Sequence, residues 1–216
     1  MAESMMGVFG GTFDPIHFGH LRTAHELLKA LSLTEVRFLP CGVPPHRAQP
    51  IADAEQRSGL VALALDGHSG FVHDDRELHR DGPSYSVDTL ESLRGDFPDA
   101  SFCLILGMDA FLGLPRWDRW QRIFELAHVV VAHRPGWRVP YRGPLGEILR
   151  ARRSRQATEL HAVEAGRIFV HPVTQLEISS TEIRDLIRSG NDPRFLLPET
   201  VRNRIRDSGC YSHPNH

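Results

Sequence analysis

Short apolar runs alternate along the chain with segments whose apolar residues recur at helical spacing. The short runs are typical of buried strands in a parallel sheet, and the second pattern is typical of helices that bury one face. The apolar runs predict strands at 5–11, 35–40, 71–75, 101–107 and 166–172, and a strand that runs into a turn over 128–136. The helical spacing predicts helices at 18–33, 54–65, 86–97, 116–127, 179–190 and 198–209, with another near 145–155.

This alternation favours an α/β fold built on a doubly wound parallel sheet of the Rossmann-like kind. A length of 216 residues suits one compact domain. We therefore expect a single domain over 1–216, in which 179–216 forms a C-terminal helical part. Residues 136–166 are rich in arginine, glycine and proline, and they predict little beyond the helix near 145–155.

Polar residues and glycines refine the expected ends of two helices. Ser86 is expected to cap the helix that starts there. Ser179 or Ser180, followed by Glu182, has the spacing of a capping box, and Gly190 is expected to end the same helix.

Charge and composition narrow the classes of partner and compartment. The formal net charge of −2 gives no global electrostatic reason to expect nucleic acid or a membrane. No apolar run approaches the ~20 residues of a membrane span, and the first residues lack the pattern of a signal peptide. Cys41, Cys103 and Cys210 are widely spaced and form no CxxC, so we expect free thiols in a cytoplasmic protein.

The stretch VFGGTFDPIHFGH, residues 8–20, concentrates glycines and histidines where the first predicted strand meets the first helix. Ligands of doubly wound sheets bind at the carboxyl ends of strands. Gly10 and Gly11 there allow a sharp turn and a close approach of backbone N–H groups to a phosphate. His17 and His20 are three residues apart at the start of the helix, so both rings can face one anion at its positive end.

Simpler interpretations of this stretch exist. A glycine pair after a strand is often only a turn, and the string is neither GxGxxG nor a Walker loop. Two histidines three apart can bind a metal, but no third ligand of a zinc site lies nearby in the sequence. The string as a whole is more specific than either part.

Taken with motifs further along, the chain resembles the HxGH-motif nucleotidyltransferases, and within them the bacterial nicotinate-nucleotide adenylyltransferases. GGTFDPIHFGH is similar to the phosphate-binding start of that family, and the later motifs follow in the family's order. These are PPHR at 44–47, PSYSVDTL at 83–90, LGMDAF at 106–111, LPRWDRW at 114–120, HRPG at 133–136 and ISSTEIR at 178–184.

The resemblance implies a reaction. ATP and nicotinate mononucleotide would give deamido-NAD and pyrophosphate, a late step of NAD synthesis. The phosphate of the mononucleotide would attack the α-phosphorus of ATP directly, so catalysis would consist of positioning and charge stabilisation. Mg²⁺ is expected with ATP, held mainly by phosphates and water, and we expect no protein ligands for a metal.

The resemblance also implies roles for individual residues. His20 would stabilise the α-phosphate in the transition state, and His17 and Arg184 would contact the triphosphate beside it. Trp117 would stack on the pyridine ring, Ser86 would bind its carboxylate, and Arg47 would contact a phosphate. The expected ATP-binding residues are Gly10, Gly11, Thr12, Phe13, Gly107, Asp109, Arg134, Ser180 and Thr181.

Structural interpretations of some of these residues stay open. Ser180 and Thr181 suit plain helix capping, and Asp109 suits the first turn of a helix, although it could also reach a ribose hydroxyl. Arg134 could be a solvated loop arginine. Trp120, at helical spacing from Trp117, fits the core better than a ligand site.

Rival functions come from three classes. The first is a relative that adenylylates nicotinamide mononucleotide, accepts both mononucleotides or acts on phosphopantetheine. The second is a nucleotide-binding sensor without catalysis, which the presence of His17, His20 and Arg184 disfavours. The third is an RNA-binding protein, which the near-neutral charge disfavours. The oligomeric state does not follow from the sequence.

Overall fold

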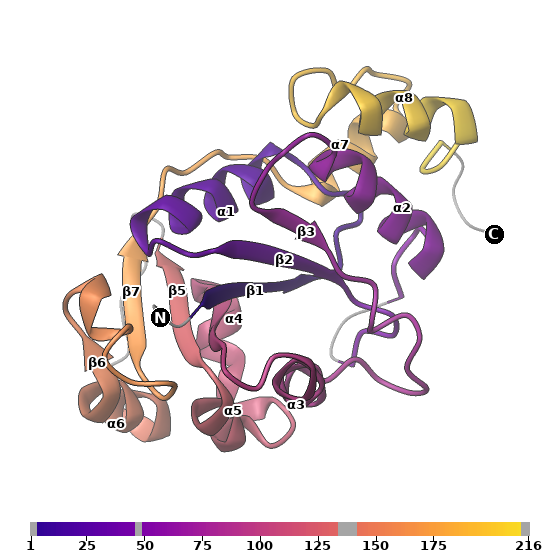
Figure 1. Ribbon diagram of the computed structural model, residues 1–216. Helices are drawn as coiled ribbons and strands as arrows, with labels where there is room; N and C mark the ends of the chain where they lie inside the picture. Colours follow the sequence, from indigo (N-terminus) through magenta and orange to yellow (C-terminus); the bar gives the residue numbers. More distant parts are fainter. Residues whose placement is uncertain (1–3, 46–48, 134–141, 213–216) are drawn as a thin grey trace. The chain divides into compact units, whose positions relative to one another are not determined.

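The computed structural model describes residues 4–45, 49–133 and 142–212, in which strands and helices alternate (Figure 1). The strands are β1 (Met5–Gly11), β2 (Glu35–Pro40), β3 (Phe71–His73), β4 (Ser101–Gly107), β5 (His128–His133), β6 (Arg153–Ser154) and β7 (Ile168–Pro172). The α-helices are α1 (Phe18–Ala30), α2 (Ala54–Leu65), α3 (Ser86–Asp96), α4 (Met108–Gly113), α5 (Trp120–Leu126), α6 (Gly143–Arg152), α7 (Ser180–Arg188) and α8 (Glu199–Ser208). Two 3₁₀ turns are η1 (Leu114–Arg116) and η2 (Ala157–Glu159).

These strands form a seven-stranded sheet in the order β3-β2-β1-β4-β5-β7-β6. β4 runs parallel to both β1 and β5, and β7 runs parallel to both β5 and β6. The predicted α/β class with a doubly wound, Rossmann-like parallel sheet is confirmed. The strand order reverses between β1 and β4, and ligands of open α/β sheets bind at the carboxyl ends of strands beside such a reversal.

Local chemistry moves several predicted helix limits. The helix expected over 116–127 begins only at Trp120, because Arg119 adopts a left-handed conformation (φ 43°) and the preceding turn is 3₁₀. The expectation that Ser86 caps α3 is wrong. Tyr85 has the extended backbone of the N-cap, so Ser86 is already the first helical residue. Four short elements were not predicted from the sequence: α4, η1, β6 and η2.

At α7 the structure decides which residue caps the start of the helix and which residue ends it. Ser179, rather than Ser180, is the N-cap, and its hydroxyl accepts a hydrogen bond from the N–H of Glu182. Gly190 follows the helix with a φ of +73°, as expected for a residue that ends a helix in the left-handed conformation.

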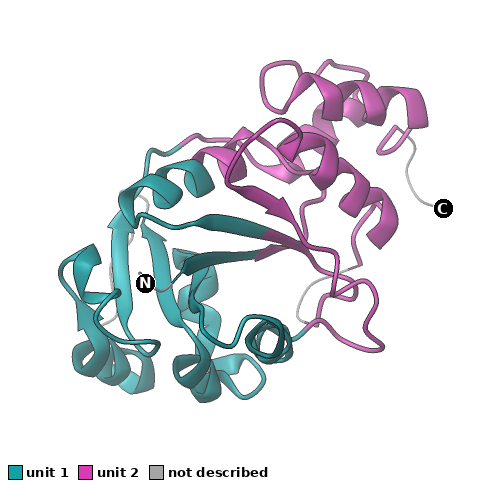
Figure 2. Cartoon of the chain, in the orientation of Figure 1, with its two compact units in different colours: residues 1–9, 23–37, 85–175 teal, residues 10–22, 38–84, 176–216 magenta. Residues whose placement is uncertain are grey.

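The chain divides into two compact units, coloured in Figure 2. Unit 1 comprises residues 1–9, 23–37 and 85–175, and unit 2 comprises residues 10–22, 38–84 and 176–216. The expectation of a single domain with 179–216 as a helical part stays a prediction.

The core of unit 1 is built on β4 and β5. Residues 101–106 of β4 and 128–132 of β5 are all buried, as strands covered on both faces require. On one side of this core, the guanidinium of Arg94 donates to the carbonyl oxygens of Ala100 (2.7 Å) and Leu126 (2.9 Å) and thereby joins α3 to the segments that enter β4 and β5.

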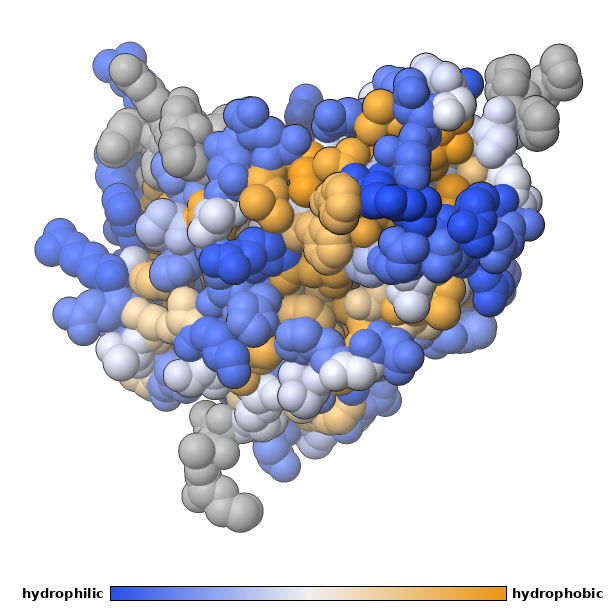
Figure 3. All heavy atoms as spheres, turned by 90° about the horizontal axis from the view of Figure 1, so that it is seen from above, coloured by the Kyte–Doolittle hydropathy of each residue, from blue (hydrophilic) through white to orange (hydrophobic). Residues whose placement is uncertain are grey.

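The surface and the cysteines bear on the expectations from composition. Figure 3, a view of one face, shows hydrophobic residues gathered across its middle with hydrophilic residues around them. Within the described ranges, no helix is long and apolar enough to cross a membrane. Cys41, Cys103 and Cys210 are free, as predicted. Burial raises the pKa of Cys103 to about 12 and that of Cys210 to about 11, so these thiols stay protonated near neutrality.

His128 is the buried titratable group at the start of β5. Its Nε2 donates to the carbonyl oxygen of Val163 (3.1 Å), and its Nδ1 accepts from the N–H of Arg167 (3.1 Å). The bond that Nδ1 accepts from Arg167 requires a neutral ring, because the imidazolium has no acceptor nitrogen. Burial lowers the pKa of His128 from 6.5 to about 4.

We therefore expect acid to weaken unit 1. Between about pH 6.5 and pH 4 the unfolded chain binds a proton that folded His128 refuses, so the free energy of unfolding falls as pH falls through this window. The loss is up to about 3 kcal/mol at the lower end. Urea unfolding at pH 7.5 and pH 5 would measure it, with His128→Gln expected to be less stable at pH 7.5 but less sensitive to acid. The exposed His79→Gln is the control, and equal acid sensitivity in all three proteins would contradict this account.

Candidate active site

The turn between β1 and α1 is shaped by a close contact between a glycine and an aromatic ring. Phe13 adopts a left-handed conformation (φ 48°), which places its buried ring against Gly11. A Cβ atom at Gly11 would lie 2.9 Å from that ring, so only glycine fits there. A Cβ at Gly10 would meet no described atom within 4 Å, so the backbone beside it is open to approach.

His17 and His20 stack on each other at the start of α1, with ring centroids 3.8 Å apart. The Nδ1 atom of His17 accepts from the N–H of Gly19 (3.1 Å), and the Nδ1 atom of His20 accepts from the N–H of His17 (3.3 Å). A nitrogen that accepts a hydrogen bond carries no proton, so each neutral ring carries its proton on Nε2. The Cβ of any other residue at Gly19 would lie 2.9 Å from the His17 ring, which explains the glycine within HFGH.

Asp14 is a buried carboxylate within this turn. Its Oδ2 accepts from the N–H of Ile51 (2.9 Å), and its Oδ1 accepts from the N–H of Ala52 (3.1 Å) and the hydroxyl of Tyr211 (2.8 Å). Arg184 Nη1 lies 3.6 Å from Oδ2. The carboxylate therefore binds three segments that are far apart in the sequence.

Arg57 is the complementary buried cation, with 1% of its surface exposed. Nη1 donates to the carbonyl oxygen of Thr12 (2.7 Å), Nη2 to that of Cys41 (2.7 Å) and Nε to that of Ala52 (3.2 Å). Arg57 thus fixes the glycine-rich turn, the segment after β2 and the start of α2 mainly through backbone carbonyl oxygens, with a further contact from Nη1 to Cys41 Sγ at 3.9 Å.

Both buried charges escaped the sequence analysis, although for different reasons. Asp14 lies inside the string GGTFDP, and a carboxylate among glycines could have been noted there. Arg57 lies on a predicted helix, where an arginine is usually solvated, and no pattern distinguished it. Tyr211 also carried no signal, because it follows the last predicted helix.

Helix α7 begins against the same turn. The hydroxyl of Ser180 donates to the carbonyl oxygen of Pro15 (2.9 Å). Arg184 Nη1 donates to the carbonyl oxygen of Asp14 (2.6 Å), and Nη2 donates to the hydroxyl of Thr181 (3.2 Å). The buried Nε of Arg184 has no hydrogen-bond acceptor within the described chain. The capping interpretation is wrong for Ser180, since Ser179 is the cap.

The predicted site residues of unit 1 lie at the starts of two helices and after a 3₁₀ turn. A Cβ at Gly107 would lie 2.8 Å from Oδ1 of Asp109, so the carboxylate of this exposed residue folds back over the end of β4. Ser86 is half-buried at the start of α3, and Tyr85 gives the first turn no side-chain cap. Trp117 is half-buried after η1. Trp120 is half-buried too, and its ring meets Phe124 edge-on rather than lying in the core.

Among the predicted residues, Gly10–Phe13, His17, His20, Ser180, Thr181 and Arg184 all belong to unit 2, and contacts within that unit join most of them. Gly107, Asp109, Ser86 and Trp117 belong to unit 1. Arg47 and Arg134 lie outside the described residues.

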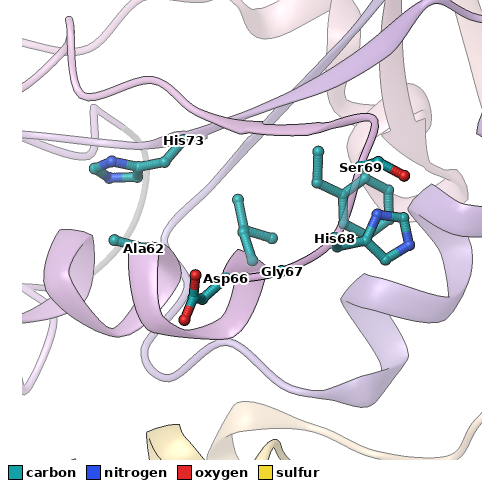
Figure 4. Close-up of a pocket in the computed structure, with 8 residues that line it drawn as sticks. Ala62, Asp66, Gly67, His68, Ser69 and His73 are labelled. Carbon is teal, nitrogen blue, oxygen red and sulfur yellow. The ribbon is translucent and has the colours of Figure 1, made fainter.

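Unit 2 also contains an open hollow of about 450 Å³ at the end of α2 (Figure 4). Its lining includes His68, whose ring stacks on Phe71 with centroids 3.8 Å apart, and His73, which lies at the other side of the hollow. None of the predicted site residues lines it. The hollow and the histidine-bearing turn are therefore separate features.

Comparison with known proteins identifies relatives of the whole chain. The family model described as cytidylyltransferase-like matches residues 8–186. A protein of Aeromonas hydrophila named "Probable nicotinate-nucleotide adenylyltransferase" is 48% identical over 98% of this chain and 99% of its own length. A protein of Methylococcus capsulatus with the same name is 47% identical over 96% of this chain and 100% of its own length.

The fold has counterparts among solved structures. The nicotinic acid mononucleotide adenylyltransferase of Plasmodium falciparum, complexed with NaAD, matches with a TM-score of 0.74 and 16% identity. The match covers 98% of this chain and 99% of the other. At that identity the likeness concerns the fold.

We expect Arg57→Ala to destabilise the protein by about 3 kcal/mol or more, because it leaves at least three backbone carbonyl oxygens without their donor in a buried place. Arg57→Lys should recover only part of this loss, since one ammonium cannot reproduce the planar fork. Urea unfolding would measure both, with exposed Arg206→Ala as the matched control. A loss no larger than that of the control would show that the carbonyl contacts contribute little.

Proposed function

Since this chain belongs to the cytidylyltransferase-like family and, within it, to the nicotinate-nucleotide adenylyltransferases, we propose that it transfers the AMP moiety of ATP to nicotinate mononucleotide. The products are deamido-NAD and pyrophosphate, which places the reaction in NAD synthesis. A phosphate oxygen of the mononucleotide forms a new bond to the α-phosphorus of ATP. The bond from that phosphorus to the bridging oxygen of the β-phosphate breaks, and pyrophosphate leaves with the electron pair.

The observation that carries this proposal is the stacked histidine pair at the start of α1. The two backbone hydrogen bonds to Nδ1 orient each ring and leave an N–H on each Nε2 atom. Such donors, held in place beforehand at a helix start, suit the negative charge that develops on the oxygens of the transferring phosphorus. His20 is proposed to contact the α-phosphate, and His17 the triphosphate next to it.

Arg184 supports a phosphate at the same turn. Its Nη1 and Nη2 atoms already have acceptors, whereas its buried Nε has none within the described chain. A buried donor without an acceptor costs free energy, which an anionic oxygen would offset. The Ser180 hydroxyl is engaged with Pro15, so Ser180 and Thr181 are proposed to act through their backbone N–H groups at the start of α7.

The remaining ATP contacts are assigned by position and motif. The backbone of Gly10, Gly11, Thr12 and Phe13 is proposed to line the nucleotide cleft. Gly107 ends β4 and Asp109 follows it at the start of α4, so the exposed carboxylate of Asp109 is proposed to bind a ribose hydroxyl. Arg134 is also proposed to contact ATP, and only its place in the HRPG motif supports this assignment.

Nicotinate mononucleotide is proposed to use α3 and the turn after η1. Tyr85 does not cap α3 with its side chain, so the first-turn N–H groups and the Ser86 hydroxyl can serve the pyridine carboxylate. The half-buried Trp117 offers a flat apolar surface for the ring. Arg47 is proposed to contact a phosphate.

Mg²⁺ is proposed to arrive with ATP. Within the described ranges no group of three or more His, Cys, Asp or Glu side chains could hold a metal ion. The ion is then held by phosphate oxygens and water and neutralises part of their charge. Action in the cytoplasm is proposed from the free cysteines.

The proposal is tested by pyrophosphate release from ATP with a panel of acceptors: nicotinate mononucleotide, nicotinamide mononucleotide and phosphopantetheine. We expect turnover with the first. Turnover with only another acceptor would assign the chain to a different adenylyltransferase. Tight ATP binding without pyrophosphate release from any acceptor would indicate a nucleotide sensor.

His20→Ala should lower kcat by about 10²- to 10³-fold, because it removes one preorganised donor to the transferring phosphate. Steady-state pyrophosphate release would measure kcat, and calorimetry should still detect ATP binding. His25→Ala, on the same helix beyond the turn, is the matched control. A fall of less than tenfold for His20→Ala, with normal thermal melting, would remove His20 from the mechanism.

We expect a preference for nicotinate over nicotinamide mononucleotide of at least about ten- to hundredfold in kcat/KM. Donors at the start of α3 suit a carboxylate, whereas the amide would leave one of them facing its own NH₂ group, and a buried unpaired group costs roughly 1–3 kcal/mol. Competition between the two mononucleotides would measure the preference.

Ser86→Ala should narrow that preference, because it should weaken the binding of nicotinate mononucleotide more than the binding of nicotinamide mononucleotide. Ser92→Ala, on the exposed side of α3, is its control. Equal kcat/KM for both mononucleotides in the unmutated protein would instead identify a dual-specificity enzyme.

A further inference from the structure

Tyr211, close to the end of the chain, contacts the turn that carries the proposed phosphate site. Its hydroxyl donates to Oδ1 of Asp14 at 2.8 Å, and the residue is 3% exposed. The two residues are 197 positions apart in the sequence. A buried hydrogen bond to a carboxylate over such a separation needs the end of the chain to be held in one place.

The backbone around Tyr211 is built to deliver this ring. Helix α8 ends at Gly209, which has a φ of +66°, and Tyr211 itself adopts a φ of +72°. A bulky residue in the left-handed region is strained, and it persists only where its surroundings hold it. The N–H of Ser212 donates to the carbonyl oxygen of Gly209 (3.1 Å), which closes the turn around Tyr211.

Asp14 connects this tyrosine to Arg184. The Asp14 carbonyl oxygen accepts from Arg184 Nη1 at 2.6 Å, and its carboxylate lies 3.6 Å from the same nitrogen. The carboxylate also accepts from the backbone N–H groups of Ile51 and Ala52, so these two bonds and the one from Tyr211 together set its orientation. Burial and the nearby carboxylate raise the pKa of Tyr211 far above its usual value, so its hydroxyl remains a donor.

We propose that Tyr211 is a positioning residue of the phosphate site: its hydroxyl orients Asp14, and Asp14 orients the Arg184 guanidinium toward the triphosphate of ATP. The proposal rests on the function given above for Arg184. It extends the site to the C-terminal segment, which no predicted motif includes. The tyrosine touches no reacting atom, so its effect falls on ATP binding rather than on the chemical step.

Tyr211→Phe removes the hydroxyl and keeps the ring. We expect KM for ATP to rise about three- to tenfold, the size of one net hydrogen bond, with kcat and KM for nicotinate mononucleotide within twofold of the unmutated protein. Calorimetry with a non-hydrolysable ATP analogue should show the same weakening without turnover. Ile205→Val shortens a buried apolar side chain of α8 and serves as the control for general destabilisation.

A double-variant cycle separates positioning from plain structural support. If Tyr211 acts through Arg184, Tyr211→Phe should weaken ATP binding much less in an Arg184→Ala background than in the unmutated protein. An unchanged ATP affinity in Tyr211→Phe, an equal loss in Ile205→Val, or full additivity with Arg184→Ala would each overturn the proposal. Failure of the proposed function would look different, because the unmutated protein itself would then release no pyrophosphate.

Discussion

The hydrogen bonds from the buried Arg57 guanidinium to backbone carbonyl oxygens hold the site-bearing turn of unit 2. A guanidinium always carries its charge, and burying it is costly unless its N–H groups are paired. Here the partners are the carbonyl oxygens of Thr12, Cys41 and Ala52 instead of a carboxylate. These oxygens belong to three separate segments. The hydrogen bonds that satisfy the buried cation therefore also hold the turn against the other two segments.

Asp14 complements Arg57, because the two charged side chains bind opposite kinds of backbone group. Arg57 binds carbonyl oxygens, whereas Asp14 binds N–H groups, and both reach Ala52. Neither charge depends on a direct ion pair with the other. The Thr12 carbonyl oxygen and the Asp14 carboxylate thus hold the shape of the turn, while Gly10 keeps open space beside the backbone. Such rigidity suits an adenylyl transfer, in which positioned donors must meet developing charge without rearranging.

Periodicity in the sequence was sufficient to predict the strands of the sheet except the two-residue β6. β1, β2 and β4 have the predicted limits and β5 has the predicted start, because apolar runs bounded by glycine, proline or charge leave few alternatives. The region after β4 was less predictable. There α4 is too short to show a helical period, and the left-handed Arg119 delays α5, although arginine gives no warning of that conformation.

Part of the candidate site follows from sequence patterns, and the rest depends on contacts that only the fold creates. The histidines, the glycines and the start of α7 were predictable, because they lie at helix and strand ends where anions bind. Ser86 was predicted as a cap and proved to be the first helical residue, since Tyr85 took the extended N-cap conformation. Arg57 and Tyr211 were invisible in the sequence, because their partners are backbone atoms and a carboxylate that only the fold brings near.

The stacked histidines show how backbone hydrogen bonds orient the rings of a polar site. Each Nδ1 atom is satisfied by a backbone N–H of the same short segment, so the tautomer is set by local geometry. Gly19 then permits the His17 ring to lie against the backbone, and the Phe13 ring meets His20 edge-on at 5.1 Å. The orientation of both imidazoles therefore depends on two features of the motif that carry no charge: a missing Cβ and an aromatic ring.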